Sequence, residues 1–294
     1  PPLAQPRVRA VAACAAPDSQ GFAIAPSSAA EAPEVSVPPD FFACDECVAE
    51  LADPADRRHA YPFINCTQCG PRYTLIEALP YDRPNTSMAK FPLCPACQRE
   101  YEDPLNRRFH AEPVACPVCG PHLSFVVPGR DPVTGDAAAV EAAVDVLRTG
   151  RVLAVRGIGG YHLLCDARDE AAVRRLRERK RRPDKPLAVM FPQRGADGLE
   201  AAREELVIGP VEQAALTDPA RSIVLVPRRP DGRIAPSVAP GLGEIGAFLP
   251  YSPLHHLLLT GFGGPVVATS GNVSGEPVLT DPAEAESRLA AVAD

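Results

Sequence analysis

Eight cysteines arranged as four Cys-x-x-Cys pairs constrain the fold of this chain more than any other feature. The intervals between successive pairs are 18, 24 and 18 residues. Two residues between ligands allow one tight turn to direct both thiolates at one ion, and a second pair completes a tetrahedral zinc site. The chain is therefore predicted to bind two zinc ions through Cys44, Cys47, Cys66, Cys69, Cys94, Cys97, Cys116 and Cys119.

Both zinc sites are predicted to be structural, because four thiolates complete the coordination of zinc and leave no position for water or substrate. In the simplest assignment, pairs that are consecutive in the sequence share one ion. The spacing is also compatible with an interleaved assignment, in which the first and fourth pairs share an ion.

The two cysteine-rich halves are repeats of one another, with an offset of 50 residues. Of 28 aligned positions, 11 are identical. Besides the cysteines, the shared residues are Glu50/Glu100, Asp53/Asp103, Pro54/Pro104, Arg57/Arg107, Arg58/Arg108, Gly70/Gly120 and Pro71/Pro121. The Asp-Pro-x-x-Arg-Arg elements indicate either an interaction surface or an internal network of ion pairs, and the sequence favours neither.

The charge of the chain argues against nucleic acid as a partner. There are 30 basic and 37 acidic residues, which give a net charge of -7 at pH 7. Residues 44–119 alone contain 8 basic and 11 acidic residues. Because binding to nucleic acid depends on neutralising phosphates with lysine and arginine, the charge argues against double-stranded RNA as a partner.

The sequence also bears on location. It begins without a signal peptide, and no apolar run approaches the roughly 20 residues that span a bilayer. Paired thiolates that bind metal indicate a reducing compartment. The chain is therefore predicted to be cytoplasmic, with no membrane contact. It starts at Pro1, and residues 290–294 continue a helical pattern, so a piece of a longer protein is expected.

From about residue 137 the sequence alternates between helical and strand patterns, which indicates an open α/β sheet covered by helices. Strands are predicted at 151–156, 187–191, 222–226 and 265–269. Helices are predicted at 140–147, 170–182 and 253–259. The glycine-rich residues 157–160 are predicted to form a turn.

Two clusters in this second half are candidates for chemistry. Seven of the nine residues from 174 to 182 are basic, and Lys185 follows just before a predicted strand. Such focused positive charge suits a polyphosphate, and the alternative is a solvated helix face. In the second cluster, Ser270, Asn272 and Ser274 follow a predicted strand, where ligands of open α/β sheets bind. The alternative there is a tight turn.

Taken together, the two clusters resemble a known family. The elements Lys180-x-Arg182-Pro183, Lys185-Pro186-Leu187 and Ser270-x-Asn272-x-Ser274-Gly275 are similar to those of the YrdC-type domain shared with threonylcarbamoyl-adenylate synthases. The resemblance implies a domain that binds ATP and a carbamate-like acceptor. It also implies that this domain forms an acyl-adenylate and releases pyrophosphate.

The tandem zinc segment, together with residues 66–74, 79–88 and 246–255, resembles the HypF family of carbamoyltransferases, which act in nickel–iron hydrogenase maturation. The implied fold class is α/β (α+β), with a small irregular double zinc-finger domain followed by an open, twisted, mixed-sheet YrdC-like domain. The implied domains are a remnant of an acylphosphatase-like domain at 1–28, a linker at 29–43, a tandem zinc-finger domain at 44–124 and a C-terminally incomplete YrdC-like nucleotide-binding domain at 135–294.

The resemblance further implies a reaction in three stages. Carbamoyl phosphate is cleaved to carbamate, carbamate is adenylated with ATP, and the carbamoyl group passes to the C-terminal cysteine of HypE. Only the adenylation stage is expected in this chain, with Zn²⁺, ATP and Mg²⁺ as cofactors. Lys180, Arg182 and Lys185 are expected to be catalytic and to hold the ATP phosphates. The nucleotide- and carbamate-binding set is expected to include Ser270, Asn272 and Ser274 as well.

Two alternatives stand beside this prediction. One is a threonylcarbamoyl-adenylate synthase that serves tRNA modification, although the four cysteine pairs are not expected in that family. The other is a zinc-stabilised interaction module that docks partners while chemistry occurs elsewhere.

Overall fold

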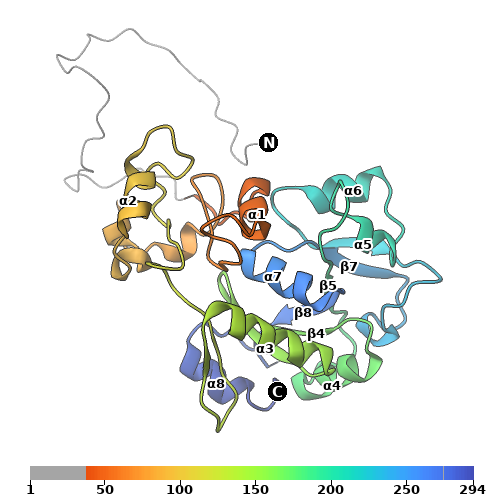
Figure 1. The fold of residues 1–294 in the computed structure, drawn as a ribbon. Coiled ribbons are helices and arrows are strands. Elements are labelled where there is room, and N and C mark those ends of the chain that lie inside the picture. Colours follow the sequence, from red (N-terminus) through yellow and green to blue (C-terminus); the bar gives the residue numbers. More distant parts are fainter. Residues whose placement is uncertain (1–37, 274) are drawn as a thin grey trace, which may run out of the picture.

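The computed structural model describes residues 38–273 and 275–294. The predicted acylphosphatase-like remnant at 1–28, the first part of the predicted linker and Ser274 lie outside the described residues. The described chain consists of a cysteine-rich lobe (residues 38–123) and a sheet domain (residues 124–294), as Figure 1 shows. Within these described residues, no helix is both long enough and apolar enough to cross a membrane.

The two halves of the cysteine-rich lobe have the same local structure. A two-turn helix begins directly after the first cysteine of each half: α1 (Asp45–Ala52) in the first and α2 (Pro95–Glu102) in the second. The second cysteine of each pair, Cys47 or Cys97, lies in the first turn of its helix and is wholly buried. Short 3-10 helices connect the halves: η1 (Tyr73–Leu75), η2 (Arg83–Asn85) and η3 (Ser87–Lys90).

The sheet domain contains a mixed sheet with the strand order β3-β4-β8-β5-β7-β6. Its strands are β3 (Leu153–Gly157), β4 (Gly160–Asp166), β5 (Ala188–Met190), β6 (Val224–Pro227), β7 (Glu244–Phe248) and β8 (Val266–Ser270). Strands β5 and β7 pair in parallel, and the other neighbours pair antiparallel. A separate hairpin, β1 (Ser124–Phe125) and β2 (Val133–Thr134), joins the cysteine-rich lobe to the sheet domain.

Helices cover both faces of the sheet. On one face, α3 (Asp136–Arg148) and α7 (Pro253–Phe262) pack side by side over β3, β4 and β8 (Figure 1). The other face carries the larger apolar cluster, to which helices contribute from α4 (Glu170–Lys180), α5 (Glu200–Arg203), α6 (Pro210–Thr217) and α8 (Pro282–Leu289). The mixed, helix-covered sheet agrees with the predicted fold class.

The predicted elements of the sheet domain are present, with shifted ends, and the elements that were not predicted are β1, β2, β4, β7, α5, α6 and α8. The glycine-rich turn at 157–160 is the hairpin that joins β3 to β4, where Gly157 pairs with Gly160. The prediction that residues 290–294 are helical was wrong. Helix α8 ends at Leu289, and the backbone N–H of Asp294 instead donates to the Val152 carbonyl at 2.8 Å.

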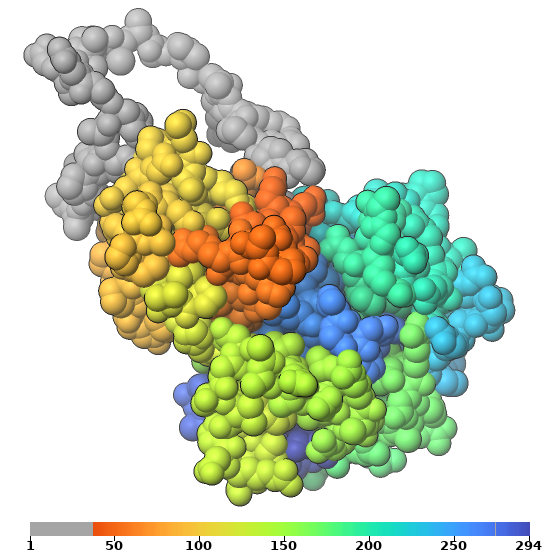
Figure 2. Space-filling view, in the orientation of Figure 1, coloured from red at the N-terminus to blue at the C-terminus, as the bar shows by residue number. Residues whose placement is uncertain are grey.

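The cysteine-rich lobe packs directly against α7 and the segment before it (Figure 2). The backbone N–H of Ala43 donates to the Tyr251 carbonyl at 3.1 Å. The Arg221 guanidinium lies over the Phe42 ring at 4.1 Å from its centroid, and Leu257 of α7 contacts the apolar cluster of the lobe. The lobe therefore fixes the chain at Tyr251, which borders the cavity described below.

Candidate functional site

The eight paired cysteines form two separate clusters, Cys44/Cys47/Cys66/Cys69 and Cys94/Cys97/Cys116/Cys119. In the first cluster the Sγ–Sγ distances are 3.7, 3.7 and 3.4 Å, and in the second 3.8, 3.7 and 3.6 Å. A regular tetrahedron with Zn–S bonds of about 2.3 Å has Sγ–Sγ edges of about 3.8 Å. Each cluster thus fits one four-coordinate zinc ion, and consecutive pairs share it.

Arginines from each half of the lobe reach the cysteines of the other half. The Nη2 group of Arg57, from the first half, donates to Cys97 Sγ at 3.1 Å. In the second half, Arg107 Nη2 donates to Cys47 Sγ at 3.1 Å. Four thiolates around one ion repel each other, and a guanidinium beside them lowers this electrostatic cost. Each half of the lobe therefore stabilises the metal site of the other half.

The neighbouring arginines complete this exchange through two glutamates. Arg58 binds Glu100 with two N–H groups, and Arg108 binds Glu50. Burial opposes ionisation of Glu50 and Glu100, but hydrogen bonds from the arginines outweigh it and hold the pKa of both carboxyls below the ordinary value. The Asp-Pro-x-x-Arg-Arg elements are therefore an internal ion-pair network, with Arg58 wholly buried.

A cavity of about 660 Å³ opens on the sheet face that carries α3 and α7. Its floor is a row of small residues on neighbouring strands, because Gly246 of β7 pairs with Ala188 of β5, which pairs with Ala268 of β8. A Cβ atom added to Gly246 would lie 2.9 Å from Ile223 Cγ2. The cavity exists because the small floor residues do not fill the space between the helical layer and strand β6.

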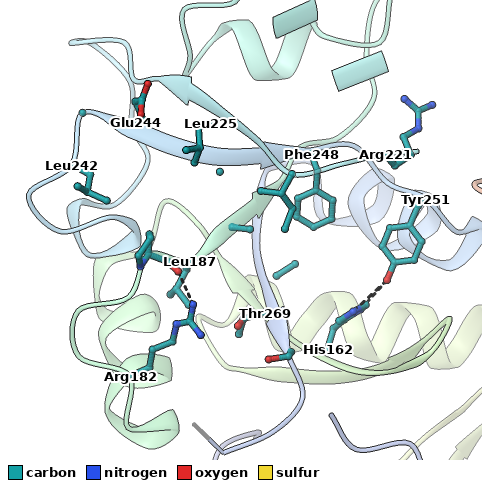
Figure 3. A pocket seen from close by; sticks show the side chains of 17 residues that line it. His162, Arg182, Leu187, Arg221, Leu225, Leu242, Glu244, Phe248, Tyr251 and Thr269 are labelled. Carbon is teal, nitrogen blue, oxygen red and sulfur yellow. Dashed lines mark hydrogen bonds between the residues drawn. The ribbon is translucent and has the colours of Figure 1, made fainter. Parts of the chain in front are cut away.

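The cavity has two chemically different sides, and Figure 3 shows them across its floor. On one side lies Arg182, whose Nη2 donates to the Pro186 carbonyl at 2.9 Å. The other side is formed by Tyr251 and His162, whose hydroxyl and Nδ1 lie 3.0 Å apart. Ser270 lines the floor between them. Arg221 and Glu244 also line the cavity, and the guanidinium of Arg221 is stacked on Phe42.

Lys180 lies behind the cavity, at the C-terminal end of α4, and is only 1% exposed. Its Nζ donates to the Ser270 carbonyl at 2.5 Å, to the Asn272 carbonyl at 2.6 Å and to Asn272 Oδ1 at 2.7 Å. All three donors of the ammonium are thus used within the protein. Burial and, to a lesser degree, the charge of Arg182 lower the pKa of Lys180 to about 8.

The turn after β8 is held by these Lys180 hydrogen bonds and by two further ones. Ser270 Oγ donates to Asn272 Oδ1 at 2.7 Å, and Asn272 Nδ2 donates to the carbonyl of Glu276. The structure therefore brings together Lys180, Ser270 and Asn272, three of the residues singled out from the sequence. Lys185 is exposed, and neither it nor Lys180 lines the cavity.

Much of the basic helix α4 is engaged inside the protein rather than solvated. Arg177 is 7% exposed, and its Nη1 donates to the carbonyls of Arg182, Pro183 and Lys185 at 2.8, 3.0 and 3.1 Å. These bonds shape the loop that carries Arg182. This positioning residue was not predicted, because no local pattern distinguishes it from the other arginines of the helix.

His162 and Tyr251 were not predicted as site residues either, since β4 was not predicted and the floor of the cavity was therefore unknown. A second cavity of about 460 Å³ lies under α3 and α8 and has a mostly apolar lining that includes Val146, Leu153 and Leu289. Arg156 lines this second cavity, but Arg182 and Ser270, two of the residues singled out from the sequence, line only the first, so the first cavity is the better candidate for the nucleotide.

Each of the two parts of the chain matches a known protein family. Residues 145–294 match the Sua5/YciO/YrdC family model, described as "Telomere recombination", and residues 43–76 and 93–126 match the model described as "HypF finger". The carbamoyltransferase HypF of Rhodobacter capsulatus is 49% identical over 300 residues, which cover 100% of this chain and 38% of that protein. The chain thus spans less than half the length of this curated relative.

Solved structures agree with this comparison. The crystal structure of full-length HypF in the phosphate- and nucleotide-bound form matches 88% of this chain and 33% of that chain, with a TM-score of 0.79 and 42% identity. A threonylcarbamoyl-AMP synthase of Bacillus subtilis is 31% identical over 153 residues, which cover 50% of this chain and 42% of that protein. The predicted resemblance to HypF is confirmed, and the synthase alternative is the more distant relative.

The arginine exchange predicts an effect across the repeat. In Arg57→Ala, zinc loss from the cluster of the second half should be about tenfold or more faster, because a group that orients and neutralises metal ligands is removed. Alkylation of the cysteines after a chelator challenge, mapped by peptide mass spectrometry, measures the loss at each cluster. Arg99→Ala, an exposed arginine of α2, is the matched control. If the cysteines of the second cluster are protected from alkylation equally well in Arg57→Ala and in the wild type, Arg57 does not stabilise the metal site of the other half.

The small-residue floor predicts that Ala188→Leu closes the cavity. The larger side chain would lie over Gly246 and Ala268, so affinity for an adenine nucleotide should fall at least about tenfold while the melting temperature changes little. Calorimetric titration with ATP and thermal denaturation measure the two effects. Ala171→Leu, on the exposed surface of α4, provides the control. Undiminished affinity in Ala188→Leu would place the nucleotide elsewhere.

The Lys180 contacts predict a large loss of stability in Lys180→Met. The substitution keeps the length of the side chain but removes all three hydrogen bonds of a buried ammonium and leaves the Asn272 carbonyl without its donor, so the free energy of unfolding should fall by about 3 kcal/mol. Urea denaturation measures this change. Lys185→Met makes the same chemical change at an exposed position and should alter stability by less than about 0.5 kcal/mol. The anchoring role of Lys180 is wrong if both variants unfold at the wild-type urea concentration.

Proposed function

Because the chain belongs to the Sua5/YciO/YrdC family and also carries two HypF-type fingers, we propose that it is the carbamate-adenylating part of a HypF-type carbamoyltransferase. One observation carries the proposal. The cavity on the open part of the sheet face joins a guanidinium, a serine hydroxyl and a neutral polar pair over a floor of small residues. Its volume and its cationic side suit a nucleotide with its phosphates near Arg182.

In the proposed reaction, a carboxylate oxygen of carbamate attacks the α-phosphorus of ATP. A new bond joins the carbamate oxygen to the α-phosphorus. The bond between the α-phosphorus and the oxygen that links it to the β-phosphorus breaks, and pyrophosphate leaves with the electron pair of that bond. Arg182 and Lys185 would offset the negative charge that develops on pyrophosphate. Mg²⁺ would accompany ATP through its phosphates, as this ion does in other nucleotide sites.

The buried contacts suggest a different role for Lys180 from the one expected at first. With its three donors bound to protein oxygens, it would position the turn of Ser270 and Asn272 rather than bind phosphate directly. The second N–H of Asn272 Nδ2 would then be a fixed donor for carbamate or the α-phosphate, and Ser270 could donate to the same ligand by exchanging its bond to Asn272 Oδ1 for it, which lowers the entropic cost of reaching the transition state.

The remaining steps and partners are proposed by likeness to the HypF relatives. Carbamoyl phosphate would supply the carbamate, and a HypE-type protein would accept the carbamoyl group at its C-terminal cysteine during hydrogenase maturation. A cytoplasmic location is proposed because the zinc thiolates require reducing conditions. Zinc would hold the cysteine-rich lobe together and take no part in adenylation, since each cluster already supplies four ligands.

Exchange of labelled pyrophosphate into ATP tests the proposal on this chain. The expected result is exchange that requires ammonium carbamate, with bicarbonate alone at the same pH as the control. Exchange that instead requires threonine together with bicarbonate would identify the protein as a threonylcarbamoyl-adenylate synthase. If neither acceptor supports exchange and ATP does not bind, the chain is a zinc-stabilised interaction module.

A further inference from the structure

The side of the cavity opposite Arg182 is formed by two residues that the proposed reaction has not yet used. His162 of β4 pairs with Ser270 of β8 in the sheet register, so both side chains project from the same face of the sheet. Tyr251 lies directly before α7, and its hydroxyl is 3.0 Å from His162 Nδ1 (Figure 3). The pair therefore lies one strand away from the serine that is proposed to contact the substrate.

The protein fixes this pair from several directions. A Cβ atom added to Gly157 would lie 3.1 Å from His162 Nδ1 and 3.2 Å from the Tyr251 hydroxyl, so the absence of a side chain there makes room for the pair. The ring of His255 lies behind it, 4.7 Å from the Tyr251 ring between centroids. The carbonyl of Tyr251 accepts the hydrogen bond from Ala43 of the cysteine-rich lobe.

Burial favours the neutral form of both members of the pair. Burial lowers the pKa of His162, and burial raises the pKa of Tyr251. A neutral imidazole has one donor and one acceptor nitrogen, and a phenol both donates and accepts. In either tautomer of His162, one hydrogen bond is used between the two residues. One donor and one acceptor of the pair are then left for a ligand.

We propose that His162 and Tyr251 bind the amino group of the carbamoyl moiety and thereby select carbamate over carboxylates of the same shape. This inference rests on the proposed function, because it concerns the orientation of carbamate in the same cavity. The carboxylate of carbamate must face the nucleotide phosphates and Arg182. Its amino group then points to the opposite side of the cavity, where an N–H donor requires an acceptor.

The acceptor left by the pair meets this requirement, whatever the tautomer of His162. A carboxylate such as acetate would place a methyl group at the same position and leave the acceptor without a partner. A buried polar group that loses its partner is costly, so a site built in this way rejects the methyl analogue. Arg182, on the other side, attracts both anions equally and does not contribute to this selection.

Binding of stable adenylate analogues tests the inference. The probes are 5′-O-(N-carbamoylsulfamoyl)adenosine, its N-acetyl counterpart with a methyl group in place of the amino group, and 5′-O-sulfamoyladenosine, which lacks the acyl group. The wild-type chain should bind the carbamoyl probe about tenfold more tightly than the acetyl probe, as one hydrogen bond to a buried acceptor predicts. Calorimetric titration of each probe gives the ratio.

The variants separate a positioning role from a structural one. In Tyr251→Phe and His162→Leu the ratio of the carbamoyl to the acetyl affinity should fall to about one, and any change in affinity for the nucleotide itself should be shared by all three probes. His162→Gln retains a donor and an acceptor and should recover part of the preference. Tyr161→Phe makes the same change as Tyr251→Phe in the lining of the second cavity and should behave as wild type.

The outcomes distinguish this inference from the proposed function. If the wild-type chain binds sulfamoyladenosine but shows no preference, or if Tyr251→Phe and His162→Leu keep the preference, the inference is wrong and the adenylate site stands. If none of the three probes binds, both the adenylate site and the selection by His162 and Tyr251 are wrong.

Discussion

The architecture of the candidate site depends on one buried cation. The ammonium of Lys180 ends helix α4 and binds three oxygens of the turn that follows β8. Charge-assisted hydrogen bonds of this kind are among the stronger interactions of a protein interior, and they join two segments about 90 residues apart in the sequence. Arg177 shapes the adjoining loop in the same way, through the carbonyls of Arg182, Pro183 and Lys185, which precede β5. The cationic side of the cavity is therefore built on buried cations that do not themselves line it.

The cysteine-rich lobe follows the same physical principle with a different partner. Its half-exposed Arg57 and Arg107 neutralise thiolates instead of carbonyl dipoles, and they do so across the repeat, so that neither half is complete without the other. The lobe in turn contacts α7 and the carbonyl of Tyr251. A structural metal module thus borders the cavity and fixes one of its walls, although the zinc clusters themselves offer no position for a substrate.

The sequence predicted what depends on local geometry. The Cys-x-x-Cys spacing predicted both metal clusters, because each pair is positioned by one turn, and the motif resemblance predicted that Lys180, Ser270 and Asn272 belong together. It could not predict the arginine exchange, since Arg57 and Cys97 are 40 residues apart and many ion-pair arrangements satisfy the same charges. The floor of the cavity was missed for a related reason. The alignment of Gly246 with its neighbours depends on the register of non-consecutive strands, and no local pattern determines that register.

The central claim is that a nucleotide binds over the row of small residues on the open sheet face. Titration of the nitrogen-15-labelled chain with magnesium ATP, followed through backbone amide chemical shifts, tests it most directly. The account predicts saturable shifts at Gly246, Ala268 and Ser270 and unchanged signals at Val146, in the second cavity. Shifts concentrated at Val146 and its neighbours, with the signals of the small-residue row unchanged, would contradict it.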